Sequence, residues 1–511
     1  MSRPNAEPAG GAASRRFALT LGGLVLLQGL LWIGLPLLLE GSIRLDVAEG
    51  VVDGPEWRLS YFRHPPFSSW LSGLAAMAGP LRYGAVYAIG WALASGSFAI
   101  AAVFIARVEK KGAAGLIALM AGLASPFATY VPIQVNHNIG VMPFWAATLV
   151  AAWFAFEGGA LGAWALLGVA VGLGLWAKYA ILHLVIPLVA LFFIVPPWRA
   201  RILSAGPWLA AAICIALIAP HFIDVAHKGA TTLRFATRTL DAAWPVRLGW
   251  IAEFILDCAA VQAGMALIAL AACGRKALMG AIAVTFARAT RTRLDLFLHA
   301  AAFGPILVIT GAAPFGVHTH YLWVTPLTLS FAAWWGHAAA RAGLRELPPL
   351  AYGAYGALAA VFVVSYIGVR ELDPMFARNP TYPEMDGPAL AALAQKYWAE
   401  HASGEIPYIV SLDEQRGLQA AGSIVFDLPY RVRVLRDGEP VNAPWLDLAD
   451  LKQRGALVVA PRALAEGTKA LGVAVRDIAR FERPMARGAK PPAIYFGVMP
   501  PEPSAVREKA E

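Results

Sequence analysis

The sequence predicts a polytopic α-helical membrane protein, with about eleven membrane-spanning helices followed by a small α/β domain at the C-terminus. The 511 residues are 58% hydrophobic and only 15% charged, whereas about a quarter of the residues are charged in typical soluble domains. Such an apolar chain cannot bury all of these side chains in a water-soluble core. Apolar runs near the roughly 20 residues that span a bilayer recur from residue 17 to about residue 368 and then stop.

The membrane part begins with a run that we expect to be retained as a helix. This run is too long for the core of a signal peptide, and no small-residue cleavage site follows it. Two later spans meet at Lys178 with almost no loop between them. The predicted spans are Phe17–Leu39, Leu81–Val108, Gly115–Val131, Ile139–Phe156, Leu161–Ala177, Tyr179–Val195, Ile202–Pro220, Trp250–Cys273, Leu294–Ala312, Tyr321–Ala338 and Ala351–Gly368.

The distribution of lysine and arginine predicts a cytoplasmic N-terminus. An odd number of spans then places the C-terminal domain outside, and the cations that remain outside indicate an anionic ligand there. We predict a cytoplasmic tail at 1–16, a membrane domain at 17–369 with its first outer loop at 40–80, and an extracytoplasmic domain at 370–511. The inside cations are Arg15, Arg16, Arg107, Lys110, Lys111, Arg199, Arg201, Arg275, Lys276, Arg288, Arg291, Arg293, Arg341 and Arg345, and the outside cations are Arg44, Arg58, Arg63, Lys228, Arg234, Arg238 and Arg247.

The C-terminal domain alternates helical and strand patterns. Gly387–His401 has helical periodicity, and Leu446–Arg454 is typical of a short helix. Ile406–Ser411 and Ala456–Ala460 have the pattern of buried strands, and Ala493–Val498 after a double proline indicates a last strand. These elements predict a small α/β unit, and we find no catalytic constellation within it.

Several functional classes are disfavoured by what the sequence lacks. The net charge of +9 lies in the membrane part, where inside loops account for it better than nucleic-acid binding. There is no Walker A loop and no Gly-rich dinucleotide fingerprint, which counts against an ATP-driven pump. The three cysteines, Cys214, Cys258 and Cys273, show neither a disulfide framework nor metal-ligand spacing. We therefore expect them to be small buried residues.

The first outer loop carries the most informative residues. Asp46 follows the first span closely, where a carboxylate can stay ionised in a partly desolvated cleft and remove a proton from a hydroxyl or amine. The alternative is that Asp46 and Glu49 are ordinary solvated acids. A double proline then fixes the backbone before Phe67–Ala78, which is too short to span and is predicted to lie along the membrane interface.

Asp46 and the later string Tyr61-x-x-His64-Pro65-Pro66-x-x-x-Trp70 resemble the membrane glycosyltransferases of family 39. This family has the GT-C fold and includes the protein O-mannosyltransferases and the lipid A aminoarabinose transferases. Weaker similarities to a bacterial branch follow in the same order along the chain. They are Val135–Asn138, Gly172–Tyr179, Ala219–His221 and Ala443–Asp447.

The resemblance implies a sugar donor carried on polyprenyl phosphate, bound from the outer side, and inversion at the anomeric carbon. Asp46 matches the catalytic aspartate of the family, the general base, and Glu49 is expected to assist. The family often has Asp-Glu here, whereas Val47 follows Asp46 in this chain. His64 occupies the position before Pro-Pro where relatives carry Lys or His, and Arg63 replaces a common Asp.

Lysine among apolar helices marks a functional site by default, and Lys178 at the outer end of its helix could neutralise the donor phosphate. The alternative is that Lys178 snorkels to the interface. His318 and His320 could contact sugar or phosphate, or bind a metal. Glu253 and Asp257 lie one helical turn apart, where they could hydrogen-bond sugar hydroxyls. The favoured interpretation for these two acids is an ion pair with Arg44 or Arg247.

The predicted site has three groups of residues and no assigned metal ligand. No cofactor is firmly implied, and a divalent metal is the less favoured alternative. The catalytic residues are Asp46 and Glu49, the donor-phosphate residues are His64, Arg63 and Lys178, and the sugar or acceptor residues are Tyr61, Asn136, Asn138, Glu253, Asp257, His318, His320 and Tyr321.

The function that these residues predict is an inverting glycosyltransferase of the bacterial inner membrane. Its expected partners are the bilayer, a polyprenyl-phosphate-linked sugar, and an acceptor that is lipid A, another lipid, a glycan or a protein. Nucleic acid is not an expected partner. A flippase or transporter of a lipid-linked substrate is an alternative, although it would need ionisable residues at mid-span. A non-catalytic envelope assembly protein is the third hypothesis.

Overall fold

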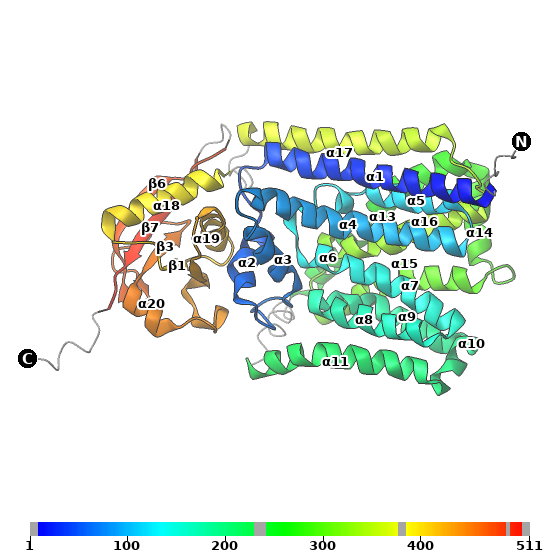
Figure 1. Ribbon diagram of the computed structural model, residues 1–511, viewed down its shortest axis with the longest axis horizontal. Coiled ribbons are helices and arrows are strands. Elements are labelled where there is room, and N and C mark those ends of the chain that lie inside the picture. The colour runs from blue at the N-terminus through cyan, green and yellow to red at the C-terminus, as the bar shows by residue number, and fades with distance from the viewer. Residues whose placement is uncertain (1–8, 229–241, 377–384, 487–490, 503–511) are drawn as a thin grey trace, which may run out of the picture.

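The computed structural model describes residues 9–228, 242–376, 385–486 and 491–502. A long helical bundle occupies one part of the molecule, and a smaller α/β domain caps one end of it (Figure 1). The first helix begins at the opposite end of the bundle. Two of the cations predicted to lie outside, Arg234 and Arg238, fall outside the described residues.

Each of the eleven predicted spans corresponds to a helix. Seven helical segments in the described chain are long and apolar enough to cross a membrane. A bent pair, Tyr179–Ile194 with Pro196–Leu203, adds an eighth if its two parts form one span. The chain is therefore a multi-pass membrane protein. The seven segments contain α1 (Ala9–Leu39), α4 (Arg82–Val108), α6 with α7 (His137–Gly140 and Met142–Gly158), α11 (Ala205–His227), α13 (Trp244–Cys273), α15 (Arg293–Ala312) and α17 (Pro349–Phe376).

The remaining predicted spans are the shorter helices α5 (Gly112–Leu123), α8 (Leu161–Ala177) and α16 (Val324–Arg341). Lys178 separates α8 from α9 (Leu182–Ile194), as the sequence predicts. A short helix that the sequence analysis did not predict, α14 (Arg275–Phe286), lies in the basic loop after α13. Helix α17 continues to Phe376, so the predicted domain boundary at residue 370 falls inside a helix.

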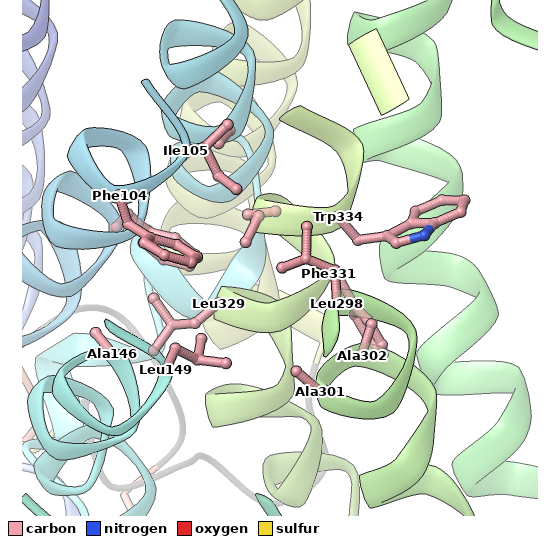
Figure 2. Packing of buried hydrophobic residues seen from close by; sticks show 14 of the residues in the cluster. Phe104, Ile105, Ala146, Leu149, Leu298, Ala301, Ala302, Leu329, Phe331 and Trp334 are labelled. Carbon is pink, nitrogen blue, oxygen red and sulfur yellow. The ribbon is translucent and has the colours of Figure 1, made fainter. Parts of the chain in front are cut away.

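Helix α16 forms the centre of the bundle, because all its residues from Val324 to Ala340 are buried. Phe331 and Trp334 of α16 pack beside Leu298 of α15, and Phe104 of α4 lies in the same apolar cluster (Figure 2). Small residues let these helices approach closely, as is common inside membranes. A Cβ atom on Gly336 would lie only 2.6 Å from the carbonyl oxygen of Ala114. Close packing in the bundle therefore depends on this glycine.

Two short helices, α2 (Leu45–Asp53) and α3 (Phe67–Ala76), lie between the bundle and the α/β domain (Figure 1). The predicted interfacial segment is α3, but its serine face does not lie against water. Ser68, Ser69 and Ser72 are buried, whereas Leu74 and Met77 at its end are exposed. Helix α3 packs its small polar residues against α2, and the position of this segment along the membrane interface stays a prediction.

The α/β domain has a five-stranded sheet of order β2-β1-β3-β7-β6. Strand β1 is parallel to β2 and β3, and β7 is antiparallel to β3 and β6. All five elements predicted in this domain are present, whereas α19, β2 and β6 were not predicted. The elements are α18 (Gly387–His401), β1 (Tyr408–Ser411), α19 (Arg416–Asp427), β2 (Arg433–Leu435), α20 (Leu448–Arg454), β3 (Ala456–Ala460), β6 (Arg476–Glu482) and β7 (Ala493–Met499), with a separate hairpin of β4 (Lys469–Ala470) and β5 (Val473–Ala474).

Helix α19 of this domain packs directly on α2. A Cβ atom on Gly422 would lie 2.6 Å from the Cβ of Ala48, so the two helices approach closely. Gln419 donates a hydrogen bond to the carbonyl oxygen of Ile43 at 2.6 Å, and Ser42 donates one to Ser423 at 2.9 Å. The α/β domain thus fixes the position of the helix that carries Asp46.

The substitution Gly422→Val is expected to push α19 away from α2, because its side chain would overlap the backbone and Cβ of Ala48. Overpacking of this kind costs about 1–3 kcal/mol. Thermal unfolding in detergent should show a lower midpoint for Gly422→Val. The control is Gly368→Val in α17, where a Cβ meets nothing within 4 Å. Equal midpoints for the two variants would contradict the proposed close contact.

Candidate functional site

Helix α2 places three carboxylates along its length. Asp46 lies in the first turn, where the positive end of the helix dipole favours an anion. Glu49 and Asp53 follow at intervals of three and four residues, which brings them toward one face. Glu49 and Asp53 are buried, with exposed fractions of 6% and 1%, whereas Asp46 stays partly exposed. The three acids therefore differ in their exposure to solvent.

A buried ion network holds Glu49 and Asp53. Arg436 of the α/β domain donates to Oε1 of Glu49 at 3.0 Å and to Oδ2 of Asp53 at 2.7 Å. Arg63 of the first outer loop lies 3.5 Å from Oε2 of Glu49 and donates to Glu414 at 2.5 Å. Burial opposes ionisation of Glu49, but the charges of Arg436 and Arg63 outweigh it and hold its pKa below the usual range. The structure thus places Glu49 and Arg63 in contact with each other.

Replacing Arg436 by Gln is expected to lower the free energy of unfolding by about 3–5 kcal/mol, because the buried Asp53 would lose its counter-charge and Glu49 would keep only Arg63. Arg433→Gln is the matched control. Arg433 is about half exposed and lies 3.3 Å from Glu56, so its loss should cost less than about 1 kcal/mol. Chemical denaturation in detergent, followed by tryptophan fluorescence, measures both. Similar losses would show that the Arg436 network is not a main support of the fold.

Asp46 lies outside this network. Among the described residues it makes no ion pair within 4.0 Å, yet its carboxylate interacts electrostatically with Lys178. Lys178 donates a hydrogen bond to Oδ1 of Asn138 and lies 5.5 Å from the centre of the Trp323 ring. Asn136 accepts hydrogen bonds from the backbone nitrogens of Asn138 and Ile139, both at 3.0 Å, and so begins α6. The structure therefore brings Asp46, Asn136, Asn138 and Lys178 into one cluster.

The backbone beside Asn136 is strained. Val135 has a φ of +44°, and a β-branched residue in the left-handed region is a conformational outlier. Strain of this kind costs about 1–3 kcal/mol and clusters at functional sites. Here it sets the direction in which Asn136 and α6 leave the preceding turn.

The pKa of Asp46 is raised from 3.8 to about 6. Burial is the largest cause, and the negative charge of Glu49 adds to it. The side chain of Asn136 and the charge of Lys178 act in the opposite direction and keep the pKa from rising further. A carboxylate with a pKa near 6 is largely ionised at neutral pH and is a stronger base than an ordinary aspartate, which suits proton removal.

The ring of His64 packs at a tilt against that of His137, a residue not selected from the sequence. The ring centres of His64 and His137 are 4.2 Å apart, and the buried Nδ1 of His137 has no hydrogen-bond partner in the described part of the chain. Burial lowers the pKa of His64 well below its ordinary value, so His64 is neutral at pH 7. His137 could have been selected from the sequence because it lies between Asn136 and Asn138, two predicted site residues.

The segment from His318 to Trp323 lies over the same cluster. Asp46 acts electrostatically on Tyr321, and Lys178 acts on His320. Nδ1 of His320 accepts a hydrogen bond from the backbone nitrogen of Leu322 at 3.2 Å, while the ring of His318 packs 4.4 Å from that of Trp250. The described residues contain no group of three or more potential metal ligands among His, Cys, Asp and Glu. Tyr321 is 47% exposed and is therefore available for a ligand.

Tyr61, Glu253 and Asp257 lie differently from the expectation. Tyr61 is buried, and its ring packs edge to face on Trp445 of the α/β domain with centres 5.5 Å apart. In the described chain neither Glu253 nor Asp257 forms the predicted ion pair with Arg44 or Arg247. Arg44 instead bonds Glu40 at 2.6 Å, and Arg247 donates to the carbonyl oxygens of Ala242 and Pro314. The prediction fails because Glu253 lies on an exposed face of α13.

Known proteins share both the sequence pattern and the architecture. Residues 63–223 match the family described as dolichyl-phosphate-mannose-protein mannosyltransferase. The lipopolysaccharide core galacturonosyltransferase RgtA of Rhizobium johnstonii is 25% identical over 237 residues, which are 45% of this chain and 47% of that protein. The match thus spans about half the length of this relative.

Solved structures resemble nearly the whole chain in fold. Crystal structures of ArnT from Cupriavidus metallidurans match it in the apo state, with a TM-score of 0.60, and bound to undecaprenyl phosphate, with a TM-score of 0.61. They cover 96% and 97% of this chain and all of ArnT, at 13% and 14% identity. The chain therefore shares the fold of these structures. The family match contains His64, Asn136 and Lys178 and begins after Asp46.

The raised pKa of Asp46 has a consequence for the stability of the protein. The folded state prefers the protonated carboxyl, so the stability that this preference contributes is present below about pH 4 and is lost as the pH rises through about 6. Asp46→Asn cannot ionise and should therefore unfold at a higher temperature than the parent protein at pH 8.

The unfolding midpoints of Asp46→Asn and the parent protein should converge as the pH falls toward 4. Asp447→Asn is the control, because Asp447 is an exposed N-cap of α20 and asparagine caps equally well. A midpoint difference between Asp46→Asn and the parent that does not change with pH would contradict the raised pKa.

Proposed function

We propose that this chain is an inverting glycosyltransferase that moves a sugar from a polyprenyl-phosphate carrier to an acceptor at the outer face of the membrane. The observation that carries the proposal is the partly exposed carboxylate of Asp46, with its raised pKa, beside the cation of Lys178. This pair can accept a proton and stabilise an anion in the same cleft. Both groups lie at the end of the bundle that the α/β domain covers.

The proposed reaction is a direct displacement. Asp46 removes the proton from an acceptor hydroxyl or amine as that oxygen or nitrogen attacks the anomeric carbon. The bond between this carbon and the phosphate oxygen breaks, and its electron pair goes to the polyprenyl phosphate. Attack from the face opposite the leaving group inverts the anomeric configuration.

Lys178 is the proposed partner of the donor phosphate. A preorganised cation facing the leaving group stabilises the charge that develops on it. The hydrogen bond from Lys178 to Asn138 and the contact with Trp323 hold the ammonium group in place. His64 is neutral and would serve by hydrogen bonding rather than by charge. Tyr321 and His320 border the same cleft and are proposed to contact the sugar or the acceptor.

Glu49 and Arg63 are proposed to act through structure. Glu49 and Arg63 pair with each other, Glu49 also pairs with Arg436, and Arg63 also pairs with Glu414. Their charges are thus neutralised by other residues of the protein. In this role Glu49 keeps Asp46 electrostatically basic, because its negative charge raises the pKa of Asp46. We therefore assign neither residue a direct contact with the donor.

The printed functions of the relatives support this class of substrate. RgtA is a lipopolysaccharide core galacturonosyltransferase, and one ArnT structure contains undecaprenyl phosphate. We propose a polyprenyl-phosphate-linked sugar as donor and a lipid, glycan or protein of the envelope as acceptor. We also propose the bacterial inner membrane as location, a cytoplasmic N-terminus and an extracytoplasmic α/β domain.

Asp46→Asn is expected to reduce sugar transfer by about 10²–10⁴-fold, the usual contribution of general base catalysis, while binding of undecaprenyl phosphate is kept. Lys178→Gln should weaken binding of that lipid about tenfold or more, because a charge-assisted contact is lost. Mass spectrometry of envelope lipids and glycans from complemented cells measures transfer, and native mass spectrometry of the purified protein measures lipid binding.

Asp447→Asn controls for the loss of one acid on the outer side and should change neither quantity. Unchanged transfer by a well-expressed Asp46→Asn protein would overturn the enzymatic proposal and favour a flippase. Unchanged binding of undecaprenyl phosphate by Lys178→Gln would remove Lys178 from the donor site. The two outcomes are independent of each other.

A further inference from the structure

A large cavity lies at the end of the bundle opposite the α/β domain. Its volume is about 980 Å³. The first turns of the described part of α1, the last turns of α4, the start of α5 and the segment 345–347 surround it. Figure 1 shows that α1 begins at this end, far from α3 and from α2, the helix that carries Asp46. The cavity is therefore separate from the proposed transfer site.

The lining of this cavity is strongly basic. It includes the cations Arg16, Arg107, Lys110 and Arg345 but only one acid, Glu346. None of these five side chains takes part in an ion pair within the described residues, whose ion pairs lie elsewhere in the chain. Four cations around one concave surface repel one another unless an anion joins them. The cavity thus has an excess of positive charge with no counterpart from the surrounding helices.

The remaining wall is apolar and open. Phe17, Val103, Leu116 and Tyr352 supply hydrocarbon and aromatic surface, and small residues such as Ala18 leave the space unfilled. A free inorganic anion would use only the basic part of this surface. A molecule with an anionic head and an apolar tail would use both parts.

We propose that this cavity binds the headgroup of an anionic phospholipid, with the upper part of an acyl chain along the apolar wall. Three features support this occupant: the unbalanced cations, the apolar wall that adjoins them, and the position at the end of membrane-spanning helices. Basic pockets between membrane helices on the cytoplasmic side are suited to anionic headgroups. In the orientation proposed above, the cavity opens to the cytoplasmic leaflet.

The test uses the full-length protein in nanodiscs that contain equal amounts of phosphatidylglycerol and phosphatidylcholine. Native mass spectrometry then counts the lipids that remain bound. The triple variant Arg16→Gln, Arg107→Gln, Arg345→Gln should retain phosphatidylglycerol about a hundredfold less than the parent, since each basic residue near an anionic headgroup contributes about fivefold to affinity. Phosphatidylcholine retention should not change.

The matched control removes three other cations from the same end of the bundle. Arg199, Arg275 and Arg288 are exposed and lie in or beside α10 (Pro196–Arg199) and α14, outside the cavity lining. Their triple replacement by Gln changes net charge equally and should leave phosphatidylglycerol retention within about twofold of the parent. A second variant, Ala18→Trp, fills the cavity without changing charge and should also reduce retention.

Three results would overturn the proposal. Equal losses from the cavity variant and the control variant would mean a general attraction of basic residues to anionic lipid. Equal retention of phosphatidylglycerol and phosphatidylcholine by the parent would mean that an uncharged lipid or detergent occupies the space. Full retention by a folded Ala18→Trp protein, as judged by an unchanged unfolding midpoint, would place the lipid elsewhere.

Discussion

The interaction on which the end of the bundle beneath the α/β domain depends is the buried contact of Arg436 with Glu49 and Asp53. Arg436 belongs to the α/β domain, whereas both acids belong to α2. A buried charge without a partner is very costly, so the domain and α2 stabilise each other only when docked together. The close approach of Gly422 to Ala48 follows from the same docking. The α/β domain is therefore part of the structural support of the site, although it contributes no residue to the Asp46 cluster.

This constraint also explains how neighbouring acids on one helix acquire different properties. Arg436 and Arg63 neutralise Glu49, which stays ionised at all ordinary pH values. Burial and, after it, the fixed charge of Glu49 raise the pKa of Asp46, which forms no ion pair with an arginine among the described residues. Lys178 limits this rise without forming a close ion pair, because its ammonium group is bonded to Asn138. These opposing effects on the pKa leave Asp46 ionised at neutral pH but more basic than an ordinary aspartate.

The sequence predicted the membrane helices well because each needs a long apolar run, and a length criterion detects such runs. Asp46 was predicted from its place after the first span and from the resemblance to family 39, Asn138 from that resemblance, and Lys178 as a lysine between apolar helices. The structure brings these residues together. Contacts between distant segments left no such local signal. Nothing around Arg436 marks it as the partner of Glu49, which lies 387 residues earlier in the chain. Tyr61 was predicted to contact the sugar or the acceptor. Only the folded structure shows that its ring packs on Trp445, which is distant in the sequence.

The ionisable residues at the two ends of the bundle differ in how they are paired. At the covered end, Arg436 pairs with Glu49 and Asp53, whereas Asp46 forms no close ion pair among the described residues. At the other end, the two ring nitrogens of His337 lie 2.6 and 2.7 Å from carboxylate oxygens of Glu109 and Asp295 and link the end of α4 with α15 and α16. The cations of the large cavity have no such partners among the described residues. A site that transfers a sugar needs rigid positioning, because a displacement of about 1 Å can cost a hundredfold in rate. A surface that contacts mobile lipid does not need this precision, which is consistent with cavity cations that have no ion-pair partner among the described residues.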